Sequence, residues 1–529
     1  MKKWFITALI FFMIMPMLSS VVDAKETQIS IMLDNVPLET DLAPYIIPKV
    51  NVTMVPLRVI SEGIGAKVSW SQSARTVTIT KDGDQLALTK GNKTASVNNQ
   101  IVPLDASVDI KNGRIVVPIR FVSENLGLKV LWSQGDQRIT LLSQGAIIPE
   151  TPLPVQPVIP PTTNSTLRGA WISTVYNLDW PSAASTGKEA QQKAEYIAML
   201  DKLQAMGMNA VFVQVRPSGD ALYSSTIVPW SKVLTGKQGQ HPGYDPLEFM
   251  IEETHRRGMS FHAWFNPFRA NMDTKTAGLA NNHVAVNHPE WIVNSGTQLI
   301  INPGIPDARQ HVIDVIMEVV QNYKIDGVHL DDYFYPTSGT FNDDNTFKLY
   351  NSKGIKNKGD WRRDNVNQFI EQLGKSIDRI KPEVEFGVSP FGVWRNKASD
   401  ITGSDTKAGI TSYDSYYADT RVWIKNEWID YIAPQIYWSM TFNNARYDKL
   451  VDWWVNEVQG TKVDLYIGQA AYKVGTPEIG WQNTQEITDQ LTYNAKYNEV
   501  KGSIFFRAGL MLKNPLGLIE VVSSYYNQS

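Results

Sequence analysis

The chain of 529 residues contains no cysteine. It therefore cannot form a disulfide, a thiolate metal site or a lipid anchor on a cysteine. It also lacks an excess of charge of either sign, because 50 basic residues stand against 53 acidic ones and leave a formal net charge of -3. Domains that bind nucleic acid need a basic surface, so we expect no nucleic-acid partner.

Long apolar runs are missing except at the N-terminus. There Lys2 and Lys3 precede an uncharged apolar run over residues 4–18, and small residues ending at Ala24 occupy the usual cleavage positions. This pattern predicts an export signal over residues 1–24. The run is shorter than the roughly 18 residues of a membrane span, so we expect no stable span after signal cleavage. We therefore predict a secreted or cell-surface protein.

An internal repeat follows the signal. Residues 52–80 recur as residues 114–142, and the conserved spacing includes the pairs Pro56 with Pro118 and Trp70 with Trp132. Each copy predicts a helix begun by the proline, a glycine turn and two short strands around the tryptophan. The segments 31–38 and 95–104 predict a matching hairpin strand in each copy. The sequence thus predicts a small α+β domain over residues 25–145.

Both copies resemble the copper amine oxidase N-terminal-like domain, a repeat found on exported bacterial proteins. The name suggests copper, but all seven histidines lie at or beyond His241. Residues 25–145 therefore lack the imidazole and thiolate ligands that copper prefers. We interpret the repeat as an attachment or interaction module, with a solvated spacer as the alternative. Residues 146–166 are rich in proline and predict an extended, semi-rigid linker.

From residue 167 to residue 529, short apolar runs alternate with longer amphipathic ones. The predicted strands cover residues 168–174, 209–215, 259–265, 326–332, 384–390, 431–438, 462–469 and 502–508. Helical patterns lie between them, as in "DPLEFMIEETHRRG". Eight strand and helix units predict an α/β fold, a (β/α)8 TIM barrel. An open doubly wound sheet is the alternative, but no glycine-rich phosphate loop follows the first strand.

Barrel enzymes carry their chemistry at the carboxyl ends of the strands. The polar and aromatic residues near these ends, which we predict to bind substrate, are Arg216, Trp264, Asn266, His329, Tyr333, Trp394, Gln435, Tyr437, Trp438 and Arg507. Aromatic rings stack on the C–H faces of sugars, and amides and arginines bind their hydroxyl groups. The pattern therefore favours a polysaccharide or other glycan as substrate. The alternative is that the aromatic residues only cap the barrel core.

Glycoside cleavage ordinarily needs two carboxyl groups. In "IDGVHLDDYFYP" strand alternation directs His329, Asp331 and Tyr333 to the barrel interior and Asp332 to the opposite face. Asp331 is therefore our first catalytic candidate. Asp332 joins it only if the chain turns there, and a salt bridge or loop cap is its alternative role.

A second catalytic carboxylate is less well defined by the sequence. Asp220, in "RPSGDALY" beyond the second predicted strand, is the other candidate, and Asp179 and Asp414 are weaker ones. His283 and His288 lie in a loop at a spacing that suits no shared metal, and the acidic turn 341–345 is a weak calcium signal. We therefore expect no metal and no cofactor.

Two glycosidase resemblances bear on this segment. Asp326 and Gly327 fit the "DGxDxDxE" signature of glycoside hydrolase family 18, but His329 replaces its first inner aspartate and Tyr333 its glutamate. The substrate-assisted chemistry of that family is therefore not supported. A closer resemblance, over residues 168–438, rests on motifs such as "RGAWISTVYNLDWPS", "NAVFVQVRPSGDALY", "MSFHAWFNPFR", "FGVSPFGVWRN" and "YIAPQIYW".

These motifs resemble the glycosyl hydrolase-like family 10, formerly domain of unknown function 187. The resemblance implies a glycosidase barrel with acidic residues after the fourth strand, and action on bacterial cell-wall glycan, including strands stripped of peptide. We therefore predict an exported glycoside hydrolase that the repeat attaches to the cell wall. Two alternatives stay open: a non-catalytic surface protein that binds carbohydrate, and a glycosidase that acts on a different polysaccharide.

Overall fold

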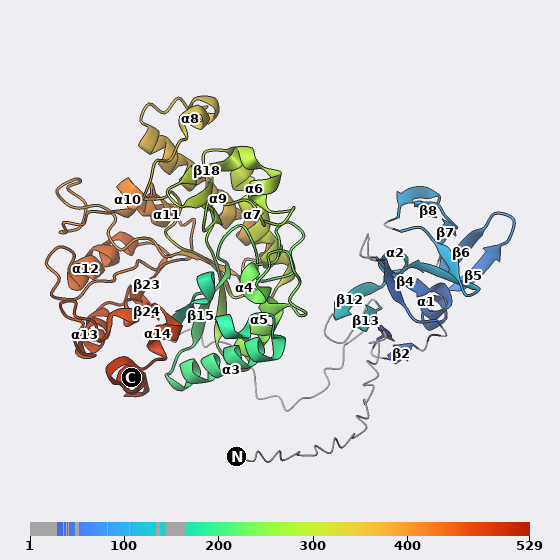
Figure 1. Ribbon diagram of the computed structural model, residues 1–529, viewed down its shortest axis with the longest axis horizontal. Helices are drawn as coiled ribbons and strands as arrows, with labels where there is room; N and C mark the ends of the chain where they lie inside the picture. The colour runs from blue at the N-terminus through green and yellow to red at the C-terminus, as the bar shows by residue number, and fades with distance from the viewer. Residues whose placement is uncertain are drawn as a thin grey trace, which may run out of the picture. The chain divides into compact units, whose positions relative to one another are not determined.

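A computed structural model describes residues 29–143, apart from positions 35, 39, 41, 48–51, 82, 105 and 134–137, and residues 166–528. The chain divides into two compact units, Met1–Pro154 and Val155–Ser529, each of which is described by itself (Figure 1). The predicted export signal and all but the last residue of the predicted linker lie outside the described residues. None of the described helices is long and apolar enough to cross a membrane.

The N-terminal unit consists of the two repeat copies. The first copy forms β4 (Val52–Pro56), α1 (Leu57–Gly63), β5 (Lys67–Ser71) and β6 (Thr76–Lys81). The second forms β11 (Arg114–Pro118), α2 (Ile119–Glu124), β12 (Lys129–Ser133) and β13 (Arg138–Leu142). The predicted order of helix, turn and two strands in each copy is confirmed. β4 and β11 pair antiparallel with Val55 opposite Val117, so the copies meet at equivalent positions.

The hairpins that precede each copy are exchanged between the copies. β1 (Ser30–Leu33) and β2 (Val36–Leu38) extend the sheet of the second copy, in the order β12-β13-β1-β2. β8 (Thr94–Val97) and β9 (Gln100–Pro103) extend the sheet of the first copy through β7 (Asp84–Thr89). β10 (Asp109–Lys111) and β3 (Tyr45–Ile47) flank β11 and β4. The two copies therefore share one core and form a single domain.

The C-terminal unit is a closed barrel of parallel strands, and the predicted TIM-barrel fold is confirmed. Its strands are β14 (Leu167–Ile172), β15 (Ala210–Arg216), β16 (Ser260–Phe265), β20 (Gly327–Leu330), β21 (Glu385–Val388), β22 (Tyr431–Ile432), β23 (Asp464–Gln469) and β24 (Val500–Phe505). Each overlaps the strand predicted in its place. β14 pairs with both β15 and β24, which closes the barrel.

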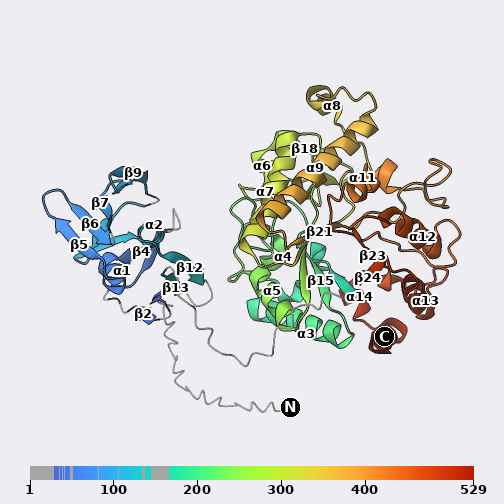
Figure 2. The same cartoon turned by 180° about the vertical axis from the view of Figure 1, so that it is seen from behind.

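Helices surround the strands (Figure 2). The longer ones are α3 (Glu189–Ala205), α5 (Pro246–Arg256), α7 (Pro306–Asn322), α9 (Lys358–Ile380), α12 (Tyr447–Val458), α13 (Gln485–Asn494) and α15 (Leu518–Gln528). Shorter ones are α4 (Lys232–Thr235), α6 (Val284–Asn287), α8 (Asp344–Tyr350), α10 (Ser412–Ser415), α11 (Thr420–Lys425) and α14 (Ala508–Met511). A small sheet of β17 (Arg269–Asn271), β18 (Ile292–Ser295) and β19 (Gln298–Ile301) lies between β16 and α7 in the chain. α5 begins where the local chemistry requires it, with Asp245 accepting hydrogen bonds from the backbone of Leu247 and Glu248.

Polar side chains at the amino ends of the strands fix the barrel register. The Asp326 carboxylate accepts a hydrogen bond from the Phe261 amide at 2.7 Å, and Asp430 accepts one from Phe386 at 2.7 Å. The first bond joins the residue before β20 to β16, and the second joins the residue before β22 to β21. Because a shift by one residue would lose these bonds, they help to define which residues reach the other end of the barrel.

The barrel interior is packed with large side chains, including Trp171, Phe212, His262 and Tyr431. The His262 ring stacks on Phe212 with centroids 4.4 Å apart, and burial lowers the pKa of His262 to about 4. On β20 the residues alternate as predicted, since Leu330 packs among the hydrophobic residues outside the barrel. Side chains therefore fill the space between the strands.

Candidate active site

The carboxyl pair lies where β20 ends. The strand stops at Leu330, and a turn closed by the Phe334 amide and the Asp332 carbonyl, 3.0 Å apart, follows it. Because the chain turns here, Asp331 and Asp332 both reach the barrel mouth, although strict alternation would separate them. Both side chains are buried, with 4% and 5% of their surface exposed.

The two oxygens of Asp331 have different surroundings. Its Oδ2 accepts hydrogen bonds from Trp264 Nε1 at 3.2 Å and from Asn266 Nδ2. Its Oδ1 has only the Tyr333 amide, at the long distance of 3.5 Å. Two donors on one oxygen keep that oxygen an acceptor, so Oδ1 is the atom available to a proton or a ligand.

A second layer of side chains orients these donors. The Gln214 Oε1 accepts from the backbone amides of Thr174 and Val175, both at 3.0 Å, so its Nε2 must be the donor to Asn266 Oδ1, at 2.5 Å. With its oxygen bound in this way, Asn266 directs its Nδ2 to Asp331. Gln214 is therefore a positioning residue that sets the orientation of the Asn266 amide.

Asp332 has its own hydrogen bonds. Gln435 Nε2 donates to its Oδ1 at 3.1 Å and to the Ser389 carbonyl at 2.9 Å. The Tyr416 hydroxyl also hydrogen bonds to this carboxylate. Tyr416, which follows β21, and Gln435, which follows β22, thus both bind the carboxylate of Asp332, which follows β20.

Burial is the main influence on both acids. It raises the pKa of Asp331 to about 7, with a further increase from the neighbouring Asp332 charge, and the pKa of Asp332 to about 6. Arg269 opposes both increases by favouring the ionised forms. Its guanidinium donates to the Pro217 carbonyl at 3.1 Å and lies 4.9 Å from the centre of the Tyr333 ring. Both carboxyl groups therefore have pKa values closer to neutral pH than a free aspartate has, which suits acid and base catalysis.

Aromatic side chains border the carboxyl pair. Tyr333 is 48% exposed, so its ring is accessible from solvent. Tyr437 stacks on Phe506 with centroids 5.7 Å apart. Burial raises the pKa of Tyr437, and the nearby charges of Asp332 and Asp331 raise it further. The structure therefore brings Asp331, Asp332, Trp264, Asn266, Gln435, Tyr333 and Tyr437 together.

Arg216 and Asp220, also predicted for the site, lie beneath its surface. Arg216 is fully buried and donates to the carbonyls of Asn266 and Pro267 at 2.7 and 3.1 Å, so it supports the turn that carries Asn266. Asp220 accepts from Gln238 at 2.8 Å, and burial raises the pKa of Asp220. No hydrogen bond recorded over residues 166–528 links Asp220 to Asp331 or Asp332.

His329 and Arg507 are also engaged within the protein. The His329 Nε2 lies 3.0 Å from Trp171 Nε1 and 2.9 Å from Ser389 Oγ, and its Nδ1 lies 3.0 Å from the Tyr431 hydroxyl. Burial lowers the pKa of His329 well below its usual range, so the ring is neutral. Arg507 forms an ion pair with Asp179, one of the two weaker acidic candidates, and binds the Leu178 carbonyl at 2.9 Å.

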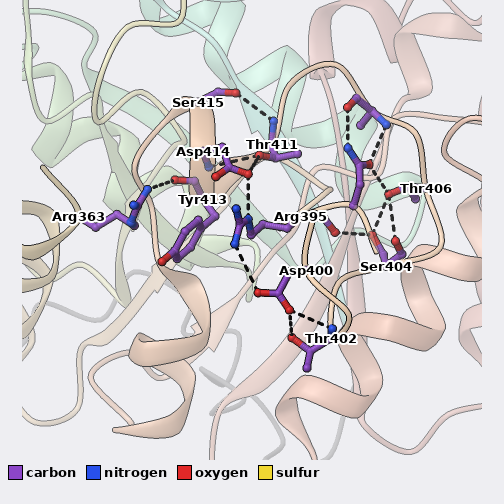
Figure 3. Close-up of polar contacts among 12 residues, drawn as sticks. Arg363, Arg395, Asp400, Thr402, Ser404, Thr406, Thr411, Tyr413, Asp414 and Ser415 are labelled. Carbon is purple, nitrogen blue, oxygen red and sulfur yellow. Dashed lines mark hydrogen bonds and ion pairs between the residues drawn. The ribbon is translucent and has the colours of Figure 1, made fainter. Parts of the chain in front are cut away.

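Trp394 and Asp414 lie in the long segment that follows β21 in the chain. Trp394 stacks on Trp453 with centroids 5.7 Å apart, which directs it toward α12. Asp414 accepts from Arg395 Nε at 2.9 Å, and Figure 3 shows Arg395 between Asp414 and Asp400. Both residues hold the loop together and form no recorded hydrogen bond to the carboxyl pair among residues 166–528.

The two weak metal signals of the sequence occupy structural positions. His283 Nδ1 accepts from the Ala285 amide at the start of α6, and His288 stacks on Trp291 at 3.7 Å. Asp343 of the acidic turn pairs with Lys358 and Arg362, both at 2.7 Å. In the part of the chain that the structure describes, no group of three or more His, Cys, Asp or Glu residues could hold a metal ion.

Three residues around the carboxyl pair were not predicted from the sequence. Arg269 stands in the quoted motif "NPFR", where an arginine four residues beyond a predicted strand was a usable signal. Gln214 lies inside a predicted strand and resembles any buried polar residue. Tyr416 comes from a long loop after β21, and nothing in the sequence indicates that it reaches Asp332.

Comparison with known proteins identifies similar chains. Residues 166–485 match the family glycosyl hydrolase-like 10, and residues 32–141 match the copper amine oxidase N-terminal domain. Both predicted resemblances are confirmed. Glycosyl hydrolase YngK of Bacillus subtilis (strain 168) is 52% identical over 363 residues, which cover 68% of this chain and 71% of the relative.

A second relative and one solved structure are also similar to this chain. Glycosyl hydrolase DigH of Escherichia coli (strain K12) is 44% identical over 381 residues, covering 67% of this chain and 86% of the relative. Among solved structures, α-L-fucosidase isoenzyme 2 from Paenibacillus thiaminolyticus is 15% identical at a TM-score of 0.45, covering 68% of this chain and 49% of its own.

Proposed function

The chain belongs to the glycosyl hydrolase-like 10 family, and from that premise we propose that it cleaves O-glycosidic bonds of a polysaccharide with Asp331 and Asp332. The observation that carries the proposal is the pair of buried carboxyl groups at the barrel mouth, each with its own set of donors. Glycoside hydrolysis uses one protonated and one ionised carboxyl group, and this pair supplies both near neutral pH.

We assign the proton to Asp331. Its Oδ1 accepts no strong hydrogen bond, and burial raises the pKa of Asp331 to about 7, so a large fraction of the acid is protonated at neutral pH. From this atom the proton passes to the oxygen of the leaving sugar. The ionised Asp332, stabilised by Gln435 and Arg269, then supports the positive charge that develops on the cleaved sugar or activates water.

We further propose bacterial cell-wall glycan, stripped of peptide, as the substrate. The support comes from the predicted export signal, from the repeat domain that we interpret as a cell-wall attachment, and from the aromatic and amide side chains around the carboxyl pair. The protein would then act outside the membrane, close to its substrate. A polysaccharide from another source is the alternative, and a panel of polymers separates the two.

The test measures new reducing ends after incubation of the full-length chain with peptide-free glycan strands, intact cell wall, chitin and storage polysaccharides. We expect release from the peptide-free strands, and a loss of about 100-fold or more in Asp331→Asn. Asp314→Asn is the matched control, because Asp314 lies on α7 and binds only Gln310, at 2.8 Å, among the described hydrogen bonds. Full activity in Asp331→Asn would contradict the assignment. Glycan binding without turnover by the wild type would favour a non-catalytic carbohydrate-binding protein.

A further inference from the structure

A cavity of about 350 Å³ lies between the segments that follow β21 and β22. Its lining includes the aromatic residues Phe391, Trp438 and Phe442, together with Ile410 and Lys407. Phe442 and Ile410 are 36% and 40% exposed, so the cavity is accessible from solvent. Its volume lies within the range of roughly 300–1,000 Å³ that small-molecule sites occupy. None of the roles described above uses this space.

The cavity is linked to Asp332 through its wall residue Phe391. The Phe391 ring lies 5.9 Å from the ring of Tyr416, whose hydroxyl bonds to Asp332, and 5.4 Å from the ring of Trp438. The Phe391 backbone also pairs with Gln435, whose amide donates to Asp332. The cavity wall at Phe391 therefore packs directly against the residues that hold Asp332, which places the cavity one layer of side chains away from this carboxylate.

The wall that carries Lys407 is held rigidly. The Asn396 side chain accepts from the Ala408 amide and the Thr406 hydroxyl and donates to the Ala408 carbonyl, all at 2.8 Å. Figure 3 shows Thr406 within this network, next to Ser404. The Lys407 amide donates to the Asn444 carbonyl at 2.7 Å, which joins this loop to the opposite wall. A wall fixed before binding loses little conformational entropy when a ligand enters.

The charges on this loop point to the chemistry of the ligand. Arg395 already pairs with Asp414 and Asp400, at 2.9 and 3.4 Å. Lys407 is exposed, and no carboxylate of residues 29–143 (gaps excepted) or 166–528 is recorded within ion-pair distance of its ammonium group. The cavity therefore combines aromatic faces, which suit the C–H face of a sugar, with a cation that suits an acid.

We infer that this cavity is a subsite for a sugar that carries a free carboxylate, next to the sugar whose bond is cleaved. Trp438 and Phe391 contact the ring, and Lys407 pairs with the carboxylate. The inference rests on the proposed function and adds a chemical requirement to it. In cell-wall glycan the carboxylate of muramic acid is free only where the peptide has been removed, so this subsite distinguishes stripped strands from intact ones.

The experiment compares peptide-free glycan strands with the same strands after their carboxylates have been converted to neutral amides. We expect the wild type to favour the acidic strands by about 5-fold in kcat/KM, the magnitude of a partly exposed ion pair. Lys407→Met should lose this preference, and Lys407→Arg should keep most of it. Lys397→Met is the matched control, because Lys397 lies on the same loop and does not line the cavity. Trp438→Leu should raise KM for both substrates with little change in kcat.

Equal hydrolysis of both strands by the wild type, unchanged in Lys407→Met, would overturn the subsite while the proposed hydrolysis stands. Absence of hydrolysis of either strand would instead contradict the proposed function. In that case calorimetric titration with soluble acidic and amidated fragments tests the subsite directly. Tighter binding of the acidic fragment that Lys407→Met abolishes would support the subsite, and equal binding of the two fragments would overturn it.

Discussion

Replacing Trp264 with phenylalanine tests which aspartate holds the proton. The substitution keeps an aromatic ring in the barrel but removes the Nε1 donor that lies 3.2 Å from Asp331 Oδ2. A hydrogen bond to a charged group is worth about 1.5–3 kcal/mol, and this long one belongs at the lower end. Because 1.36 kcal/mol corresponds to one pKa unit, the pKa of Asp331 should rise from about 7 by about one unit.

The assay is the pH dependence of kcat/KM on peptide-free strands. If Asp331 must be protonated, activity falls as pH rises through its pKa, so Trp264→Phe should move the alkaline limb upward by about one pH unit. A shift of the acidic limb instead would show that Asp331 works as the base. Unchanged limbs would show that the Asp331 carboxyl does not control the rate. Trp291→Phe is the control, since Trp291 ends the short 3-10 helix Pro289–Trp291 before β18 and stacks on His288.

Three further predictions follow from the same contacts. Arg269→Met removes the cation that lowers the pKa of both aspartates, so the acidic and the alkaline limbs of the profile should both move upward by about one pH unit, with partial recovery in Arg269→Lys. Gln214→Glu leaves Asn266 without its donor, so kcat should fall about 10-fold or more with little change in KM, and the alkaline limb should rise because Asp331 loses hydrogen bonding. Asp331→Asn should stabilise the protein at pH 8 by about 2–4 kcal/mol. The pKa of Asp331 is about 7 in the folded protein, well above its usual value, so the folded state loses stability as pH rises through about 7 and this carboxyl group ionises. The asparagine cannot ionise and avoids that loss. Melting temperatures should therefore differ at pH 8 and converge near pH 4; an Asp331→Asn variant less stable than the wild type at pH 8 would contradict the burial penalty.

Much of the fold could be predicted because its signals are local. Parallel barrel strands are buried on both faces, so residues 210–216 form a short, mostly apolar run between amphipathic helices. The two repeat copies align without gaps, and this alignment predicted a helix and a pair of strands in each copy. The exchange of the hairpins β1–β2 and β8–β9 could not be predicted, because equivalent strands of two similar copies present similar pairing edges.

The site was predicted less completely because its residues are joined by geometry. Position after a strand correctly indicated that Trp264, Asn266 and Gln435 lie near Asp331 and Asp332. The same rule placed Arg507 and Trp394 in the binding set, although Arg507 pairs with Asp179 and Trp394 stacks on Trp453. The position of a residue along its strand specifies the end of the barrel at which it lies. The direction of its side chain depends on how that side chain packs against the neighbouring loops.

The sequence by itself determined the barrel, the repeat domain and the segment that carries the acids, since apolar periodicity and chain order are local properties. Only the tertiary structure decided that β20 ends at Leu330, so that Asp331 and Asp332 both enter the mouth. It also decided that Oδ2 of Asp331 is occupied by Trp264 and Asn266 while Oδ1 stays available. These properties depend on burial and on donors from β15, β16 and distant loops, and both arise only when segments far apart in the chain come together.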